Sequence, residues 1–176
     1  MKISNFFLVF LFCLYTGNSS AEIFYIDIDK IINQTKVGKY INKEFDDLKK
    51  INNAKNLESK NKLKEREESL IAQKNIINEN EFNNKLNLFR KDVNDFNQLS
   101  QKSNRDLQNK LMKNKAKFLK LIEPILIDYV ATNKITYLLQ KKYIIVGHND
   151  LNKTTDIIEL VDKKINISNF NDSITK

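Results

Sequence analysis

The spacing of apolar residues changes twice along this chain. Ile23 to Asp27 reads as a short apolar strand, which is followed by a brief amphipathic turn that ends at a glycine. From Lys39 to Glu123 there is no glycine and no proline, and the sparse apolar residues have helical spacing. After Lys134 the extended pattern returns, with predicted strands at Ile135–Leu139 and Tyr143–Val146. The pattern predicts an α+β chain in which a long helical segment interrupts a small three-stranded β-sheet.

The second half of the long segment carries a heptad pattern. Its apolar residues step by 4, 3, 4 and 3, which is typical of a helix that packs along another helix. The pattern resumes after a polar gap at Ser100–Asn104. The residues of this seam are Phe82, Leu86, Phe89, Val93, Phe96, Leu107, Leu111, Phe118, Ile122 and Ile125. The first half of the segment has a thinner apolar stripe, so we expect the helices to flex, especially near the gap.

The long segment is predicted to fold back on itself as a helical hairpin. A single helix would be about 130 Å long at 1.5 Å per residue. Asn78 and Glu81 resemble a capping box, and they stand immediately before the seam begins. We therefore expect two helices, Gly38–Ile77 and Glu79–Thr132, with the tip of the hairpin near residues 77–82.

The same pattern divides the chain into parts. We expect a discontinuous β-body at residues 22–37 and 124–167, a hairpin arm at 38–123 and a frayed tail at 168–176. A body of this size is marginal for a stable core by itself. It would gain from oligomerisation, which covers the edges of its sheet.

Two residues in the second half are expected to shape its helices. Pro124 is the only proline and lies inside an apolar run, so it predicts a kink there. Thr155 is expected to cap a final short helix, because acidic residues follow it in the first turn.

Residues 1–21 have the features of a secretory signal peptide. Lys2 gives a positive start, an apolar run extends from Phe6 to Tyr15, and small residues precede a cleavage position after Ala21. The run is shorter than the about 20 residues that span a membrane. Cys13 is the only cysteine, so the mature chain would have no disulfide and no thiolate site. The chain is therefore predicted to be exported.

The charge balance is strongly basic. The formal net charge is +8 at pH 7, from 30 Lys and Arg residues against 22 Asp and Glu residues. One interpretation is a lysine-rich solvated surface. Another is a field that attracts acidic partners, such as anionic lipid headgroups or acidic polypeptides. Nucleic acid is a poor fit for an exported chain.

The reactive residue types do not form a catalytic pattern. Asp27 and Asp29 are a close acidic pair, but a strand end and a helix start commonly carry such residues. His148 is the only histidine, and the mature chain has no cysteine to complete a metal site with it. The sequence shows no phosphate loop, nucleophile motif or zinc spacing. We expect no enzyme activity, no cofactor and no metal.

Three stretches resemble the Skp (OmpH) family of periplasmic chaperones for outer-membrane proteins. IFYIDIDKIINQTKVGK is similar to the family's opening strand and the turn into its arm, and NENEFNNKLNLF looks like the hairpin tip. IEPILIDYVATNKITYLLQKKYIIVGHNDLNKTTDIIELVDKKI looks like the base of the returning arm, two strands and a closing helix. The arms are richer in asparagine and poorer in alanine than the family pattern.

The resemblance implies a periplasmic homotrimer in which three bodies join through their sheets. Three arms would hang like tentacles around a central cavity, where unfolded outer-membrane proteins are held without ATP before membrane insertion. The residues expected to join the bodies are Ile23, Tyr25, Ile26, Ile28, Leu138, Ile144 and Val146. Anionic lipid or lipopolysaccharide is a further candidate partner.

Arm residues off the seam are the first candidates for contact with a client protein. The seam phenylalanines, including Phe96 and Phe118, either contact clients or pack within the arm. Basic residues either line a positive surface or belong to a solvated face. The client-contact candidates are Ile71, Ile76, Phe82, Leu88, Phe89, Lys74, Lys85, Arg90 and Lys91, and further basic arm residues are Lys102, Arg105 and Lys110.

Two other hypotheses remain open at the level of sequence. One is a structural coiled-coil scaffold of the cell envelope, and the other is a peripheral protein that binds anionic envelope lipid. A rigid scaffold should have a continuous seam, and the polar gap at Ser100–Asn104 argues against one.

Overall fold

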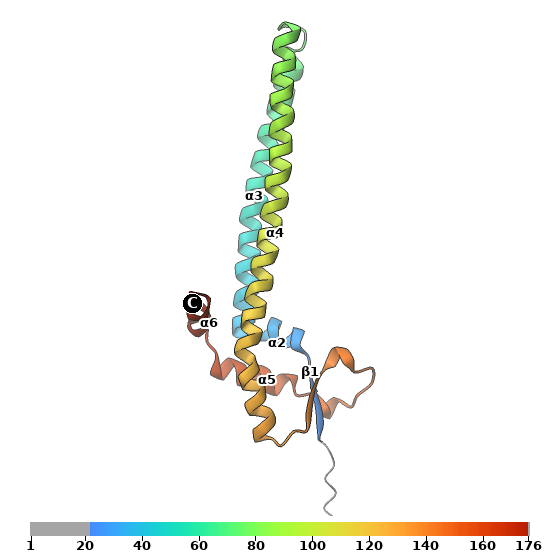
Figure 1. Ribbon diagram of the computed structural model, residues 1–176, viewed down its shortest axis with the longest axis vertical. Coiled ribbons are helices and arrows are strands. Elements are labelled where there is room, and N and C mark those ends of the chain that lie inside the picture. Colours follow the sequence, from blue (N-terminus) through green and yellow to red (C-terminus); the bar gives the residue numbers. More distant parts are fainter. Residues whose placement is uncertain (1–21, 176) are drawn as a thin grey trace, which may run out of the picture.

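The computed structural model describes residues 22–175, with side chains described as far as Asp172. The predicted signal peptide lies outside the described residues. A small body carries a long two-helix arm (Figure 1). The elements are β1 (Ile23–Ile26), α2 (Ile28–Gln34), α3 (Lys36–Gln73), α4 (Glu79–Thr132), β2 (Tyr137–Gln140), α5 (Thr154–Lys164) and α6 (Ile167–Thr175), with 3-10 turns at Lys141–Tyr143 and Asn149–Leu151.

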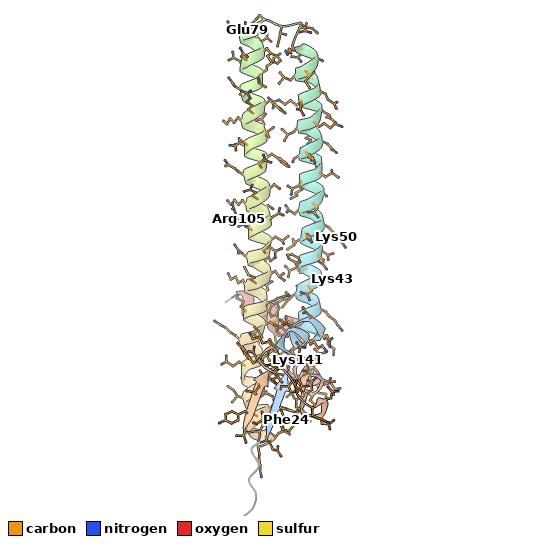
Figure 2. The ribbon with its side chains drawn as sticks, turned by 90° about the vertical axis from the view of Figure 1, so that its right-hand side faces the viewer. Phe24, Lys43, Lys50, Glu79, Arg105 and Lys141 are labelled. Carbon is orange, nitrogen blue, oxygen red and sulfur yellow. The ribbon has the colours of Figure 1, made fainter. Side chains whose placement is uncertain are left out.

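The arm is an antiparallel hairpin of α3 and α4, which lie side by side in both views (Figures 1 and 2). The Asn78 side chain accepts a hydrogen bond from the Glu81 N–H at 2.9 Å, as the capping sequence predicted, and α4 has the predicted bounds. α3 ends at Gln73, earlier than predicted. The N–H groups of Ile76 and Ile77 both donate to the Gln73 carbonyl oxygen, and these bonds close the reversal.

The body contains a two-stranded parallel sheet. In its register Ile23 lies beside Tyr137 and Ile26 beside Gln140. Parallel neighbours cannot be joined by a tight turn and need a crossover connection. Here α2 and the whole arm form that connection, which explains why the first strand is so far in sequence from its partner.

The predicted third strand at Tyr143–Val146 does not form, so the prediction of a three-stranded sheet was wrong. The other edge of β1 is occupied by the segment that precedes α5. Tyr25 and Asn152 form an isolated bridge, and the Lys153 N–H donates to the Tyr25 carbonyl oxygen at 2.9 Å. With that edge taken, the predicted strand has no partner there, and Ile145 is fully exposed at 101%.

The core lies where α2, α5 and α6 meet the base of the arm. Ile31, Phe118, Ile122, Ile157 and Val161 are all fully buried in one apolar cluster. Burial of such side chains contributes about 1.5–3 kcal/mol each, so this joint holds most of the packing that unites the arm with the body.

Gly38 allows α3 to start close to α2. A Cβ at this position would lie 1.6 Å from the carbonyl oxygen of Ile32, so no side chain fits there. The Thr35 hydroxyl accepts a hydrogen bond from the Gly38 N–H at 3.2 Å and donates to the Ile31 carbonyl oxygen at 2.9 Å. This buried threonine therefore links the end of α2 to the start of α3.

Pro124 lies inside α4, between Ile122 and Ile125, which are buried in the core. The kink expected at Pro124 stays a prediction, whereas the expected cap of the final helix was wrong. Thr155 does not cap α5, which starts one residue earlier. The buried Thr154 hydroxyl instead accepts a hydrogen bond from the Asp27 N–H at 2.9 Å and so ties α5 to the end of β1.

The tail from Ser168 was expected to fray, but residues Ile167–Thr175 form α6. Phe170 is fully buried, and its ring meets the Phe118 ring edge-on with a centroid separation of 6.2 Å. Ile167, Phe170 and Ile174 have the i, i+3, i+7 spacing of an amphipathic helix, a signal that the expectation of a frayed terminus left unused.

Candidate functional site

The arm is held together by a narrow apolar seam. The side chains of Phe82, Phe89 and Phe96 are half-buried, which fits packing against the facing helix. From residue 46 through residue 110 the only buried side chain is Leu70, at 8% exposure. Most of the surface of both arm helices is therefore open to solvent.

Polar pairs cross the arm at intervals and supplement the seam. The crossing pairs are Glu44–Lys110, Asn52–Asn104, Asn52–Ser103, Arg66–Asp92 and Gln73–Lys85. The two exposed ion pairs, Glu44–Lys110 and Arg66–Asp92, contribute little free energy, typically about 0–1 kcal/mol each. Together the crossing pairs set the register of the two helices. Other basic side chains point away from the seam, as Lys43, Lys50 and Arg105 do in Figure 2.

The seam borders a surface hollow near the middle of the arm. An open hollow of about 670 Å³ lies there, lined by apolar Leu63, Phe96 and Leu99 and by polar residues that include Ser100 and Ser103. This is the region of the polar gap, where the sequence predicted weak packing between the helices.

Exposed apolar side chains are scattered along the arm. The off-seam candidates Ile71, Ile76 and Leu88 are 66%, 80% and 55% exposed. Phe82 and Phe89, the other apolar candidates, are half-buried in the seam. Sequence analysis missed four more exposed apolar residues on the arm: Ile51, Leu57, Leu99 and Met112. Their helical phase, off the heptad stripe, is the signal that would have identified them.

The basic candidates differ in how free their charges are. Lys74, Arg90 and Lys91 are exposed. Lys85 is half-buried, because its Nζ lies 3.0 Å from Glu81 Oε1 and donates to Gln73 Oε1 at 2.8 Å. Lys74, Arg90 and Lys91 are therefore accessible to an incoming molecule, whereas Lys85 is engaged in contacts at the tip of the hairpin.

The body also exposes apolar side chains, which we call the body patch. Its members are Ile23, Tyr137, Leu139, Tyr143, Ile145 and Val146. Of the residues expected to join bodies, Ile23 and Val146 are exposed, at 44% and 89%. Ile28, Leu138 and Ile144 are half-buried, and Tyr25 and Ile26 are buried within the body.

A second hollow adjoins the sheet. It has a volume of about 690 Å³, is open to solvent, and is lined mainly by apolar side chains of β1, β2 and the end of α4, among them Ile26, Leu126, Ile135 and Leu138. The sheet therefore has apolar surface on one side that its own chain leaves unfilled.

Asp27, Asp29 and His148 lie near a helix start or on the surface, with Asp29 in the first turn of α2. The Asp27 carboxylate caps α2 by accepting from the Lys30 N–H at 3.0 Å, and it lies 3.6 Å from Lys141 Nζ. His148 is exposed, with Nδ1 3.0 Å from Asp150 Oδ2. Within residues 22–175 no group of three or more His, Cys, Asp or Glu side chains is arranged to hold a metal ion.

Two regions contain groups with shifted pKa values. Burial, with a further contribution from Asp156, raises the pKa of Tyr129 at the arm base, where the Tyr129 hydroxyl donates to Asp156 Oδ2 at 3.3 Å. On the arm, a hydrogen bond from Lys62 lowers the pKa of the Glu58 carboxyl and raises that of Lys62. None of these residues belongs to the candidate contact set.

The fold and these surfaces define a class of protein, in which a small mixed body bears a long helical hairpin with exposed apolar and basic side chains. No helix in the described part of the chain is long and apolar enough to cross a membrane. The family of OmpH-like outer membrane proteins matches residues 22–161, and the chain belongs to this family, as the sequence resemblance predicted.

A solved structure agrees with the family assignment. The chain is similar to a crystal structure described as a candidate outer membrane chaperone (OmpH-like) from Caulobacter crescentus CB15. The two share 14% sequence identity with a TM-score of 0.67, over 85% of this chain and 88% of that chain. At this identity the likeness establishes the fold. No curated protein matches the sequence.

Proposed function

We propose that this protein is an ATP-independent periplasmic holdase chaperone, exported by cleavage after Ala21. It binds unfolded outer-membrane proteins between flexible arms and prevents their aggregation before membrane insertion. Membership of the OmpH-like family supports the chaperone class. The observation that carries the proposal is the arm surface, where exposed apolar side chains lie among basic ones on helices that bury little of themselves.

The arm chemistry suits a client that has no fixed shape. A holdase contacts many unrelated sequences, which favours scattered apolar side chains on an adaptable support over one shaped pocket. Ile71, Ile76 and Leu88 supply such contacts, and Lys74, Arg90 and Lys91 flank them. Cleavage after Ala21 removes Lys2 and leaves a formal net charge of +7, which attracts acidic clients and accelerates their capture.

The remaining candidates have secondary roles in the proposal. Phe82 and Phe89 contact a client where the two arm helices separate, since both are half-buried in the seam when the helices are together. Lys85 keeps its side chain at the tip and contributes to the positive field.

Self-association through the bodies is part of the proposal, with three chains forming a cavity between their arms. The body here comprises residues 22–37 and 124–167, and the arm comprises 38–123. The body patch supports the interface, because exposed apolar side chains gather near a sheet of only two strands. Joining bodies would cover the patch and the hollow beside the sheet.

The test is to dilute a urea-unfolded outer-membrane barrel protein into buffer with the mature chain, 22–176, and to follow light scattering. We expect suppression that saturates near three chains per client without nucleotide. The triple variant Ile71→Ser, Ile76→Ser and Leu88→Ser should need a several-fold higher concentration, because it loses exposed apolar contact area.

A matched control replaces exposed polar residues of the same helices: Asn53→Ser, Asn83→Ser and Asn94→Ser. This variant should suppress aggregation as well as the unchanged protein. Unchanged client aggregation at every ratio, with a chain that is folded and helical, would overturn the chaperone proposal and leave the envelope scaffold as the better account.

The basic charge favours a second, compatible function as a peripheral binder of anionic envelope lipid. Sedimentation with anionic vesicles at low and high salt tests it. Binding that weakens with salt supports it, because screening shortens the range of surface charges to about 8 Å at physiological ionic strength. Absence of binding at low salt removes it.

A further inference from the structure

The last helix lies outside the part of the chain that matches the family. The match ends at residue 161, whereas α6 spans Ile167–Thr175. Figure 1 shows α6 beside the base of the arm, reached from α5 by a short link. It packs against both arm helices, α3 and α4, close to where they enter the body. α6 therefore sits at the joint between the arm and the body.

One aromatic side chain anchors this helix. Phe170 is fully buried and meets Phe118 of α4 edge-on, at 6.2 Å between ring centroids. Ile41 of α3 and Ile165 at the end of α5 belong to the same apolar cluster. Phe170 thus shares a core with residues from each element that forms the joint.

The rest of α6 gives it little independent stability. Among its described side chains, residues 167–172, only Phe170 is buried. The helix has 9 residues, and isolated helices shorter than about 12–15 residues are marginal in water. Its start is capped by Asn166, whose Oδ1 accepts from the Asn169 N–H at 2.8 Å. The helix should therefore fold only while Phe170 is docked.

We propose that α6 is a reversible strap on the arm base. When α6 is docked, it completes the core around Ile41 and Phe118 and holds the arm to the body. When it undocks, it unfolds, those side chains lose their cover, and the base of the arm opens more readily. The strap sets how freely the arm moves, whatever the arm holds.

Hydrogen exchange measured by mass spectrometry on the full mature chain, with Phe170→Ala, tests the strap. We expect amides of 167–175 to lose protection and amides at the arm base, 37–45 and 115–122, to exchange at least tenfold faster. Amides near the tip, 70–90, should exchange at an unchanged rate and serve as the internal control.

If Phe170→Ala fails to fold, a matched pair of variants at an exposed position of α6 still tests the proposal, because neither changes the core. Asn171 is exposed on α6. Asn171→Gly should undock the helix more often than Asn171→Ala, by about fivefold, which is the difference in helix propensity between the two residues. The base amides should shift in the same direction between the two variants.

Two results would overturn the proposal. One is loss of protection in 167–175 with exchange at the arm base unchanged within twofold, which would make α6 a passive appendage. The other is equal exchange in both Asn171 variants at every peptide of the tail and the base. Neither readout depends on client binding.

Discussion

At the scale of single residues, close approaches at the joint decide which amino acids are allowed. Gly38 is the clearest case, because the carbonyl oxygen of Ile32 occupies the place where a side chain would begin. Thr35 and Thr154 are buried for a different reason, since each hydroxyl completes a hydrogen bond that joins two elements. Such positions tolerate little change although none of them would contact a client.

We predict that Gly38→Ala destabilises the protein by at least about 2 kcal/mol, because its Cβ would meet backbone that cannot move aside without separating α2 from α3. Urea unfolding followed by circular dichroism measures the change. Gly147→Ala is the control: its Cβ would lie 3.3 Å from the Ile144 side chain and 3.4 Å from the Tyr25 ring, so a small shift accommodates it. Equal stability of the two variants would contradict the role given to Gly38.

At the scale of elements, the two arm helices are aligned by specific polar contacts but bury little apolar surface against each other. Capping at Asn78 and the polar pairs across the helices define how α3 and α4 align. Beyond the base of the arm the apolar seam buries few side chains, and a surface hollow adjoins it beside the pair of Asn52 and Asn104. We expect the arm to bend there, because helix stability comes mostly from packing an apolar face.

The double variant Asn52→Leu and Asn104→Leu should stiffen the arm. It replaces a polar crossing contact with an apolar layer, and partial burial of two leucines should slow amide exchange in the middle of the arm about tenfold. The paired control, Asn53→Leu and Asn94→Leu, places leucine on exposed positions and should leave exchange unchanged. Equal exchange in both double variants would show that the gap does not control arm flexibility.

At the scale of the whole molecule, the parallel sheet closes only when both ends of the arm meet. β1 pairs with β2, and the connection between them consists of α2 and the whole arm. The small body then leaves the apolar side chains of the body patch uncovered, of which Ile145 and Val146 are 101% and 89% exposed. The predicted strand at Tyr143–Val146 is thus apolar without a partner in its own chain, a state that favours contact with another copy.

The variant Ile145→Asp with Val146→Asp should weaken self-association about 100-fold, equivalent to about 2.8 kcal/mol, because it places charge in an apolar interface. Sedimentation or light scattering after size-exclusion chromatography gives the mass as a function of concentration. Leu99→Asp with Met112→Asp, on exposed arm positions, is the control and should leave the mass unchanged. A body-patch variant that retains the mass of the unchanged protein would place the interface elsewhere.

The sequence by itself determined the long helices and their reversal. Heptad spacing and a capping signal are local properties, so the bounds of α4 and the Asn78 cap followed directly from them. The family resemblance likewise depended on the order of such local patterns. Exposure of Ile71 and Leu88 followed from their phase relative to the seam, whereas Ile76 is exposed in the turn beyond the end of α3.

The tertiary structure alone decided which segments pair or dock, because their partners are distant in sequence. The apolar run Tyr143–Val146 pairs with neither edge of the sheet, and the free edge of β1 is instead contacted by Asn152 and Lys153. The expected frayed tail instead forms α6, whose Phe170 ring packs against Phe118 in the core. The spacing of Ile167, Phe170 and Ile174 is helical, but where the helix docks depends on contacts between segments that local patterns do not specify.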